Sequence, residues 1–225
     1  MLAAAMRRLL TAVVLLVLGG AVLLGWLAAR GPDSAQAARI AEVLTDPAPA
    51  DEPPAYAHCV SCHLHDGSGR PDGSIPRLTG QRKAVLANKL HRLRNGMMKL
   101  PVMEPYARTL PPDEVTEIAT YLSELPELEL SAGDLGEADR TRGAALFTEH
   151  CAACHGANGE GSDPLFASRL CGQYPGYLER RLEEAAAGSR GDADAIMQGV
   201  VAAVPAEDLP PIVAWLGAGK GCATR

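Results

Sequence analysis

The sequence predicts an all-α fold made of two tandem copies of one small helical domain. One observation is an internal repeat: the motif Cys-x-x-Cys-His at residues 59–63 recurs at 151–155, and Leu-x-Gly-Gln at 78–81 recurs at 170–173, both 92 residues later. The other is the spacing of apolar side chains, which is helical in several segments, whereas no segment alternates with the period of two that a strand requires. We therefore expect one domain at 56–130 and a second at 131–225.

Each copy is predicted to contain a short helix at the Cys pair, a middle helix and a closing helix. In the first copy, Pro111-Pro112-Asp113 is a typical start for the closing helix. The apolar residues that mark the helices are Leu86, Leu90 and Leu93 in the middle helix, Val115, Ile118, Ala119 and Leu122 in the closing helix, and Gly143, Leu146 and Phe147 before the second Cys pair.

The aromatic content and net charge of the chain limit which cores and which ligands these domains can have. Only 4% of the 225 residues are aromatic, so each domain has few large core side chains, and a bound group inside each is physically reasonable. The formal net charge of −6 argues against nucleic-acid binding.

The N-terminal 55 residues have a different character from the repeats. Arg7 and Arg8 precede an uncharged run over residues 9–29, which as a helix spans about 30 Å, the thickness of a bilayer core. We expect residues 1–30 to be a membrane anchor, with cleavage of a signal peptide after Ala37 as the alternative. Residues 31–55 are rich in Pro and acids and are predicted to form a tether. With either outcome the remainder works outside the cytoplasm.

The repeated motif indicates covalent haem. Two Cys residues three positions apart lie about one helical turn from each other, so Cys59 with Cys62 and Cys151 with Cys154 can each reach the two vinyl groups of a haem. The adjacent His63 or His155 then faces the iron. Zinc would need four ligands at each site, and a dithiol redox motif does not need the His that follows in both copies. We therefore expect two c-type haems.

Methionine is the expected sixth ligand of each iron. Outside the leader the first copy has Met97, Met98 and Met103, whereas the second has only Met197. Met103 and Met197 each precede an apolar residue of the closing segment by seven positions, and we interpret Met97 and Met98 as core residues. A thioether at the sixth position raises the reduction potential and leaves no position for a substrate.

The region from about residue 56 to 220 resembles the two-haem class I cytochromes c of the cytochrome c4 kind. The resemblance rests on the paired Cys motifs, the Pro76-to-Gln81 loop and its second copy, the Met spacing and the closing helices with Tyr121 and Trp215. It implies two cytochrome c domains whose haems exchange electrons in a periplasmic carrier. It also implies that the Pro76 carbonyl is the partner of the His63 ring.

The chain departs from the family pattern at several places. Ser168 stands where the first copy has Pro76, so the carbonyl partner of His155 is left open. The first copy has Asp51 and Ala55 at the places of Gly143 and Phe147, so its first helix is expected to be short. We expect His65 or His58 to face solvent beside the haem.

Two classes of function fit this pattern. The first is an electron carrier, not an enzyme, anchored in the inner membrane through residues 9–29 and passing electrons from a quinol-oxidising complex toward a terminal oxidase or reductase. The alternative is the haem subunit of a periplasmic dehydrogenase of the sulfide or thiosulfate type, or a haem enzyme such as a peroxidase. Basic residues exceed acidic ones in residues 56–126, which favours an acidic surface on a redox partner.

Two Cys residues remain outside the haem motifs, Cys171 and Cys222. An exported chain leaves them in an oxidising compartment, and in class I cytochromes the closing helix packs back on the first part of its domain, so we expect a disulfide between them. Two alternatives stay open: Cys171 as a small buried residue with Cys222 a terminal thiol, or Cys171 as an iron ligand.

Overall fold

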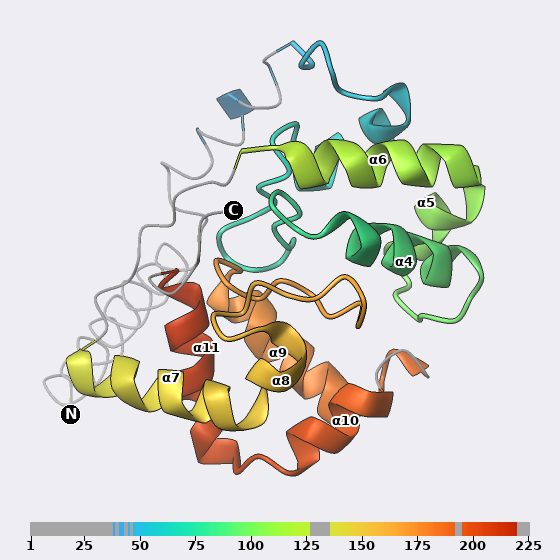
Figure 1. Cartoon of the computed structure of the whole chain (residues 1–225). Helices are drawn as coiled ribbons and strands as arrows, with labels where there is room; N and C mark the ends of the chain where they lie inside the picture. Colours follow the sequence, from blue (N-terminus) through green and yellow to red (C-terminus); the bar gives the residue numbers. More distant parts are fainter. Residues whose placement is uncertain are drawn as a thin grey trace, which may run out of the picture. The chain divides into compact units, whose positions relative to one another are not determined.

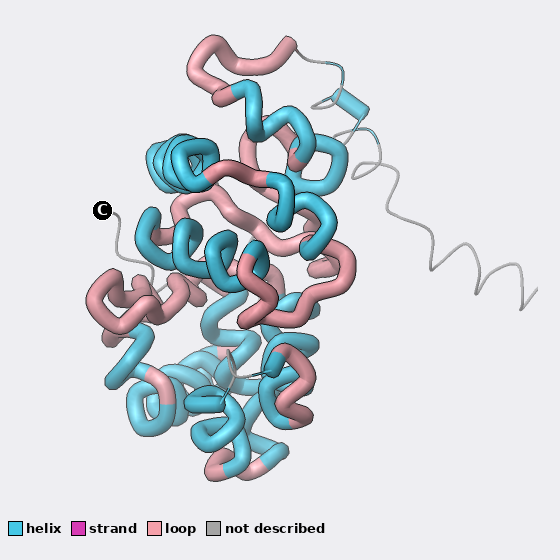
Figure 2. The backbone as a smooth tube through the Cα atoms, turned by 90° about the vertical axis from the view of Figure 1, so that its right-hand side faces the viewer, coloured by secondary structure: helices cyan, strands magenta, loops and turns pink. Residues whose placement is uncertain are grey.

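The computed structural model describes residues 38, 41, 42, 45, 47–126, 136–191 and 195–219. These residues from 45 onward belong to one compact unit that begins at Val43. In the described part every regular element is a helix, and the one strand-like pairing is an isolated antiparallel bridge between Ser162 and Ala167 (Figures 1 and 2). The predicted all-α fold is confirmed there.

The first repeat is built around the closing helix that the sequence predicts. Its helices, in chain order, are η1 (Pro54–His58), α3 (Val60–His63), α4 (Lys83–Arg94), α5 (Glu104–Thr109) and α6 (Pro112–Glu124). Helix α6 begins with a Pro in its first turn, followed by Asp113 and Glu114, which favour the positive end of the helix dipole. Its predicted face, which includes Val115, Ile118 and Leu122, is buried in a core shared with Tyr56 of η1 and Leu86 of α4.

The second repeat has five corresponding helices, of which the first is longer, and an added 3₁₀ turn before the last. Its helices are α7 (Glu137–His150), α8 (Ala152–His155), α9 (Pro175–Ala186), α10 (Ala195–Ala202), η3 (Ala206–Asp208) and α11 (Leu209–Gly217). Helix α7 crosses α11 at Gly143, where a Cβ atom would lie 2.3 Å from the Pro211 carbonyl oxygen. Phe147 and Trp215 stack beside this crossing, with ring centroids 4.8 Å apart. The missing side chain at 143 therefore allows the two helices to touch.

The closing helix of the second repeat corrects one expectation. The sequence suggests that Pro210 and Pro211 interrupt this helix early. In the structure the 3₁₀ turn η3 precedes them, and α11 starts at Leu209 with the prolines in its first turn. A proline there removes no helical hydrogen bond, because the first N–H groups of a helix have no partner inside it.

No single helix in the described ranges is long and apolar enough to cross a membrane. One bent pair of helices, Ala195–Ala202 and Ala206–Gly217 at 101° to each other, has together the length and apolar composition of a membrane span. Buried core helices of soluble proteins can have the same length and composition. The predicted anchor at residues 9–29 lies outside the described residues, and so does the alternative cleavage site at Ala37.

Candidate functional site

The two Cys-x-x-Cys-His motifs adopt the same local structure. In the first, the backbone N–H groups of Cys62 and His63 both donate to the Cys59 carbonyl, at 3.1 and 2.8 Å. In the second, Cys154 and His155 donate to the Cys151 carbonyl, at 3.2 and 3.0 Å. Each motif therefore forms one tight helical turn, α3 or α8, which places the second Cys and the His on consecutive positions of that turn.

Both His side chains are buried and oriented by a backbone carbonyl. His63 is 5% exposed and His155 8%. The Nδ1 atom of His63 lies 3.3 Å from the Pro76 carbonyl oxygen, and that of His155 lies 2.8 Å from the Ser168 carbonyl oxygen. An Nδ1 atom that faces a carbonyl oxygen carries the proton, so the Nε2 atom keeps the lone pair that a metal ion needs.

The second contact answers a question that the sequence left open. Ser168 replaces the proline of the first copy, yet its carbonyl lies even closer to the His ring. The partner is a backbone group, which any residue type supplies, so the loop conformation and not the proline decides the contact.

Burial keeps both imidazoles neutral. It lowers the pKa of His63 from 6.5 to about 4, against the opposing effect of the Pro76 carbonyl. Burial also lowers the pKa of His155, with a smaller contribution from the positive charge of Lys89. A neutral imidazole is the form that coordinates a metal ion.

The motif cysteines form no disulfide. Cys59, Cys62, Cys151 and Cys154 are unpaired, although a spacing of three positions is also that of redox-active dithiols. Burial raises the pKa of the Cys59 and Cys151 thiols to about 11, with smaller contributions from Glu52 at Cys59 and from the second Cys of each pair.

The residue after each His has a left-handed backbone. In the second motif this residue is Gly156, with φ of 80°, and in the first it is Leu64, with φ of 62°. A left-handed conformation is unfavourable for Leu, but the side chain is only 2% exposed, and its burial offsets the strain. The loops that follow are equivalent: Gly69 N–H donates to the His63 carbonyl, and Gly161 N–H donates to the His155 carbonyl.

An aromatic residue that sequence comparison missed supports the first motif. Ala55 stands at the aligned place of Phe147, but the buried ring is that of Tyr56, which is fully buried and lies 5.3 Å from the Tyr121 ring. The segment before Cys59 is a 3₁₀ helix of five residues, with three residues per turn, whereas α7 has 3.6. Tyr56, three positions before Cys59, therefore takes the place that Phe147, four positions before Cys151, takes in α7.

The surroundings of the first motif differ from the prediction in where the packed part of the repeat begins, and one of the two candidate histidines faces solvent. His65 does not face solvent freely: its Nδ1 atom lies 2.5 Å from Glu52 Oε2, and both side chains are largely buried. Glu52 belongs to the predicted tether, so the packed part of this repeat begins before residue 56. His58, in contrast, is exposed as expected.

The burial of the methionines differs from the prediction at Met97. Met98 is buried, as expected for a core residue, but Met97 is 50% exposed. Met103 precedes α5 and packs half-buried against Leu93 and Met98, and Met197 lies half-buried in α10. His/Met ligation at both irons stays a prediction.

The two His-supporting loops bind each other through a reciprocal pair of Gln side chains, which we call the Gln clamp. Gln81 donates to the Arg169 carbonyl at 3.0 Å and accepts from the Arg169 N–H at 2.8 Å. Gln173, the repeat equivalent of Gln81, does the same to Arg77, at 2.9 and 3.0 Å.

The clamp connects the two His residues through a short hydrogen-bonded path. Arg77 follows Pro76 and Arg169 follows Ser168, and those two residues supply the carbonyls to His63 and His155. Further reciprocal bonds run beside the clamp, from Arg82 Nε to the Glu160 carbonyl at 3.1 Å and from the Tyr174 hydroxyl to the Ser68 carbonyl at 2.9 Å.

Several arginines have a buried Nε–H group that suits a cofactor carrying carboxylates. The Nε atoms of Arg70, Arg92, Arg94 and Arg190 are buried without a hydrogen-bond partner in the described structure. Buried N–H donors of a cation need acceptors, and the two propionates of a haem are acceptors of the right charge. Together with free Cys pairs and neutral, oriented His rings, these donors fit haem. When bound, a haem supplies one-electron redox chemistry at each site.

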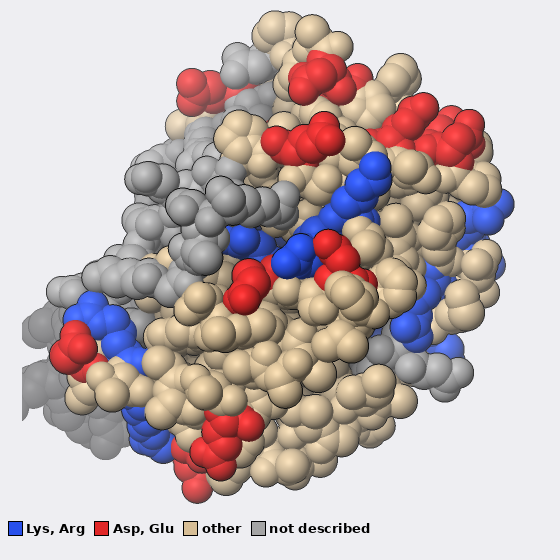
Figure 3. Space-filling model, viewed as in Figure 1, with Lys and Arg blue, Asp and Glu red and all other residues tan. Residues whose placement is uncertain are grey.

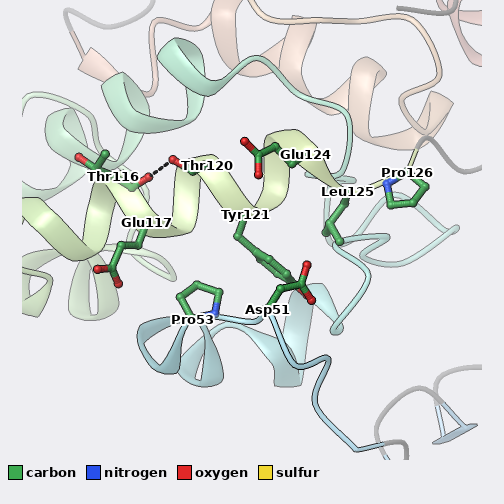
Figure 4. Close-up of a pocket in the computed structure, with 9 residues that line it drawn as sticks. All are labelled: Asp51, Pro53, Thr116, Glu117, Thr120, Tyr121, Glu124, Leu125 and Pro126. Atoms are coloured by element: carbon green, nitrogen blue, oxygen red, sulfur yellow. Dashed lines mark hydrogen bonds between the residues drawn. The ribbon is translucent and has the colours of Figure 1, made fainter.

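A pocket of about 380 Å³ lies apart from these residues, between residues 51–53 and α6 (Figure 4). The carboxylates of Asp51, Glu117 and Glu124 line it, together with Tyr121, and the residues that line it include no haem-motif Cys or His. Acidic side chains gather over α6 on the same face of the molecule, above the basic ones nearer α4 (Figure 3). Such a pocket does not suit a small anionic substrate.

Comparison with known proteins agrees with this geometry. Residues 141–219 match the family model described as cytochrome c, and residues 55–122 match that of cytochrome c oxidase, cbb3-type, subunit III. The chain is 31% identical over 175 residues to a thiosulfate dehydrogenase electron acceptor of Thiomonas intermedia, covering 74% of this chain and 80% of that one. The chain belongs to the di-haem, cytochrome c4-like family of class I cytochromes c. It is an electron-transfer cytochrome with two c-type haems.

Two further relatives extend the comparison of this di-haem cytochrome. It is 27% identical over 176 residues to cytochrome c4 of Azotobacter vinelandii, covering 71% of this chain and 83% of that one. The crystal structure of reduced cytochrome c4 from Pseudomonas stutzeri superposes with a TM-score of 0.62 at 27% identity, covering 72% of this chain and 94% of that chain. Both relatives therefore match across both repeats.

Of the two cysteines outside the haem motifs, Cys171 is oxidised. Cys171 is buried and disulfide-bonded, which removes the alternative of a free thiol and that of an iron ligand. Its predicted partner, Cys222, lies outside the described residues, so the pairing stays a prediction.

Proposed function

We propose that this di-haem cytochrome carries electrons on the periplasmic side of the bacterial inner membrane, from a thiosulfate-oxidising dehydrogenase toward a terminal oxidase. It is held there by residues 9–29 and is not itself an enzyme. The observation that carries the proposal is the Gln clamp, because it joins the backbone supports of His63 and His155 directly. Two one-electron sites so connected can accept electrons at one surface and release them at another.

The donor is inferred from the relative of Thiomonas intermedia, a thiosulfate dehydrogenase electron acceptor that aligns across both repeats. Two electrons leave when two thiosulfate ions join through a sulfur–sulfur bond, which matches the two sites of this chain. The match of the first repeat to a subunit of a cbb3-type oxidase supports an oxidase as the acceptor. The excess of basic residues in that repeat suits an acidic docking surface.

The chain's own residues support transfer without substrate turnover. Buried, neutral His rings fixed by carbonyls limit the movement of the ligands between redox states. A Met at each sixth position would also leave no free position for peroxide. We therefore expect the purified holo-protein to lack peroxidase activity.

The donor is tested by mixing the full-length holo-protein with a purified thiosulfate dehydrogenase and following haem reduction by absorbance. Reduction that requires both thiosulfate and the dehydrogenase supports the proposal. A protein that ascorbate reduces but the dehydrogenase does not would overturn it. A quinol-oxidising complex in place of the dehydrogenase tests the alternative donor.

The anchor is tested separately by fractionation. We expect the protein to stay with membranes in high salt and to leave them only in detergent. A mature protein that begins at Ala38 would contradict this.

A further inference from the structure

A buried carboxylate lies beside the haem motif of the first repeat. The His65 Nδ1 atom donates to Glu52 Oε2 at 2.5 Å, and the side chains of His65 and Glu52 are only 16% and 5% exposed. A charge that is removed from water acts strongly on its surroundings, because few water molecules screen it. Glu52 is therefore an electrostatic feature of this repeat that electron transfer has not yet been connected with.

The backbone holds Glu52 close to the motif from two sides. The Pro53 carbonyl accepts the Tyr56 N–H at 2.8 Å, and the Tyr56 carbonyl accepts the Cys59 N–H at 2.7 Å. These two turns form the five-residue helix η1, which at about 2 Å per residue is only roughly 10 Å long. On the other side, His65 follows His63 by two positions and binds the carboxylate directly.

The negative charge of Glu52 acts on atoms of the motif. After burial, it is the next cause of the raised pKa of the Cys59 thiol, about 11. After burial, it also contributes to the raised pKa of Tyr121, whose hydroxyl donates to the His65 carbonyl at 2.7 Å. The Cys59 sulfur is a predicted point of haem attachment, so a charge that acts on this sulfur also acts on the haem.

The fold does not require a carboxylate at this place. The residue 92 positions after Glu52 is Ala144 in α7, and the second motif nevertheless forms the same helical turn. Burial of an acid is unfavourable unless its charge is compensated. The acid of the first repeat therefore adds a property that the folding of the motif does not explain.

The electric charge of a haem differs between its redox states. Loss of one electron adds one positive charge at the iron, so a negative charge nearby stabilises the ferric form and lowers the reduction potential. We propose that the Glu52 carboxylate lowers the reduction potential of the first haem. This haem gives up its electron more readily than the same haem beside a neutral residue. The inference goes beyond the proposed function, since it holds for any donor and any acceptor.

The test is a redox titration of the full-length holo-protein, followed through the NMR signals of the haem methyl groups. Contacts with Cys59 or Cys151 assign each signal to one haem. Glu52→Gln keeps the size of the side chain and removes its charge. At a fixed applied potential, we expect the ratio of reduced to oxidised first haem to rise about threefold or more, which is ~28 mV or more for one electron. The second haem, in the other repeat, should shift less.

Three control variants separate the charge from the contact. His65→Gln breaks the same contact but keeps the carboxylate, so the ratio should not rise. Glu52→Gln/His65→Gln differs from His65→Gln only in the carboxylate, and its ratio should exceed that of His65→Gln by about the same threefold factor. Asp51→Asn removes an equal charge from an exposed position beside Tyr121 (Figure 4), where water screens it, and should have a smaller effect.

Three results would overturn the inference. One is an unchanged ratio for the first haem in Glu52→Gln. Another is an equal rise in Glu52→Gln and His65→Gln, because the effect would then come from the broken contact. The third is an equal rise at both haems, which would assign the effect to the net charge of the protein and not to the position of Glu52. None of these results bears on the proposed donor, since the electrode supplies the electrons.

Discussion

Replacing Gly143 by Ala tests whether the crossing of α7 and α11 determines the stability of the second repeat. The added Cβ would lie 2.3 Å from the Pro211 carbonyl oxygen and 2.7 Å from Trp215 Cβ. Both distances are about 1 Å shorter than a normal contact, and both neighbours are fixed parts of α11, so neither can turn away. The two helices must therefore separate.

Two opposing effects determine how much Gly143→Ala changes the free energy of unfolding. Ala is favoured over Gly inside a helix by about 1 kcal/mol. Separating the helices by about 1 Å removes a quarter to a half of the dispersion energy of each contact that opens, including the contact between the Phe147 and Trp215 rings. Overpacking of this kind costs about 1–3 kcal/mol or more. We expect a net loss in the free energy of unfolding of about 2 kcal/mol, or a fall in Tm of about 4–8 °C.

The control is Gly199→Ala in α10, where nothing lies within 4 Å of the added Cβ. It should stabilise the protein by about 0.5–1 kcal/mol. Thermal unfolding of both holo-variants, followed by circular dichroism at 222 nm, measures the difference. If Gly143→Ala melts at or above the wild-type temperature, the close helix contact does not hold in solution and the reasoning fails.

Three further predictions concern the His-supporting loops. Leu64→Gly relieves a left-handed backbone but empties a buried site, so it should lower the free energy of unfolding by about 1–3 kcal/mol in urea titrations; a raised midpoint would contradict this. Burial raises the pKa of Tyr121 from 10 to about 12, so the unfolded chain loses this proton first and stability falls as the pH rises from 10 to 12. Tyr121→Phe should lose about 1 kcal/mol at neutral pH with its hydrogen bond to the His65 carbonyl, yet show a shallower alkaline decline, and equal slopes would reject the assignment. Gln81→Ala with Gln173→Ala leaves buried backbone groups unpaired, so calorimetry should resolve two separate unfolding transitions; a single transition at the wild-type temperature would show that the Gln clamp does not couple the repeats.

Local patterns allowed most helices and the buried positions of the two motif His residues to be predicted from the sequence. The helical spacing of Val115, Ile118 and Leu122 depends on neighbours within two turns, and α6 buries these positions as expected. The His positions follow from the motif itself, since a single helical turn fixes them relative to the Cys pair.

Features that depend on distant backbone atoms could not be predicted in this way. Gln81 and Gln173 were visible as repeated residues, but their partners lie 88 and 96 positions away and are main-chain groups that every residue has. The role of Tyr56 depended on a 3₁₀ helix in place of an α-helix, which shifts the register by one residue. The carbonyl that orients His155 likewise depends on the loop, since Ser168 gives no signal of its own.

The Gln clamp has the symmetry of a homodimer within one chain. Each Gln binds the backbone of the same aligned residue in the other repeat: Gln81 binds Arg169, and Gln173 binds Arg77. The contact is therefore self-complementary, as a two-fold interface is. A single-domain protein with this loop would form the same contact with a second copy of itself. Duplication then needs no new interface, only a joining segment that raises the local concentration of one copy near the other. Once joined, the two copies can diverge, as the buried Gly73 and the exposed Leu165 have done.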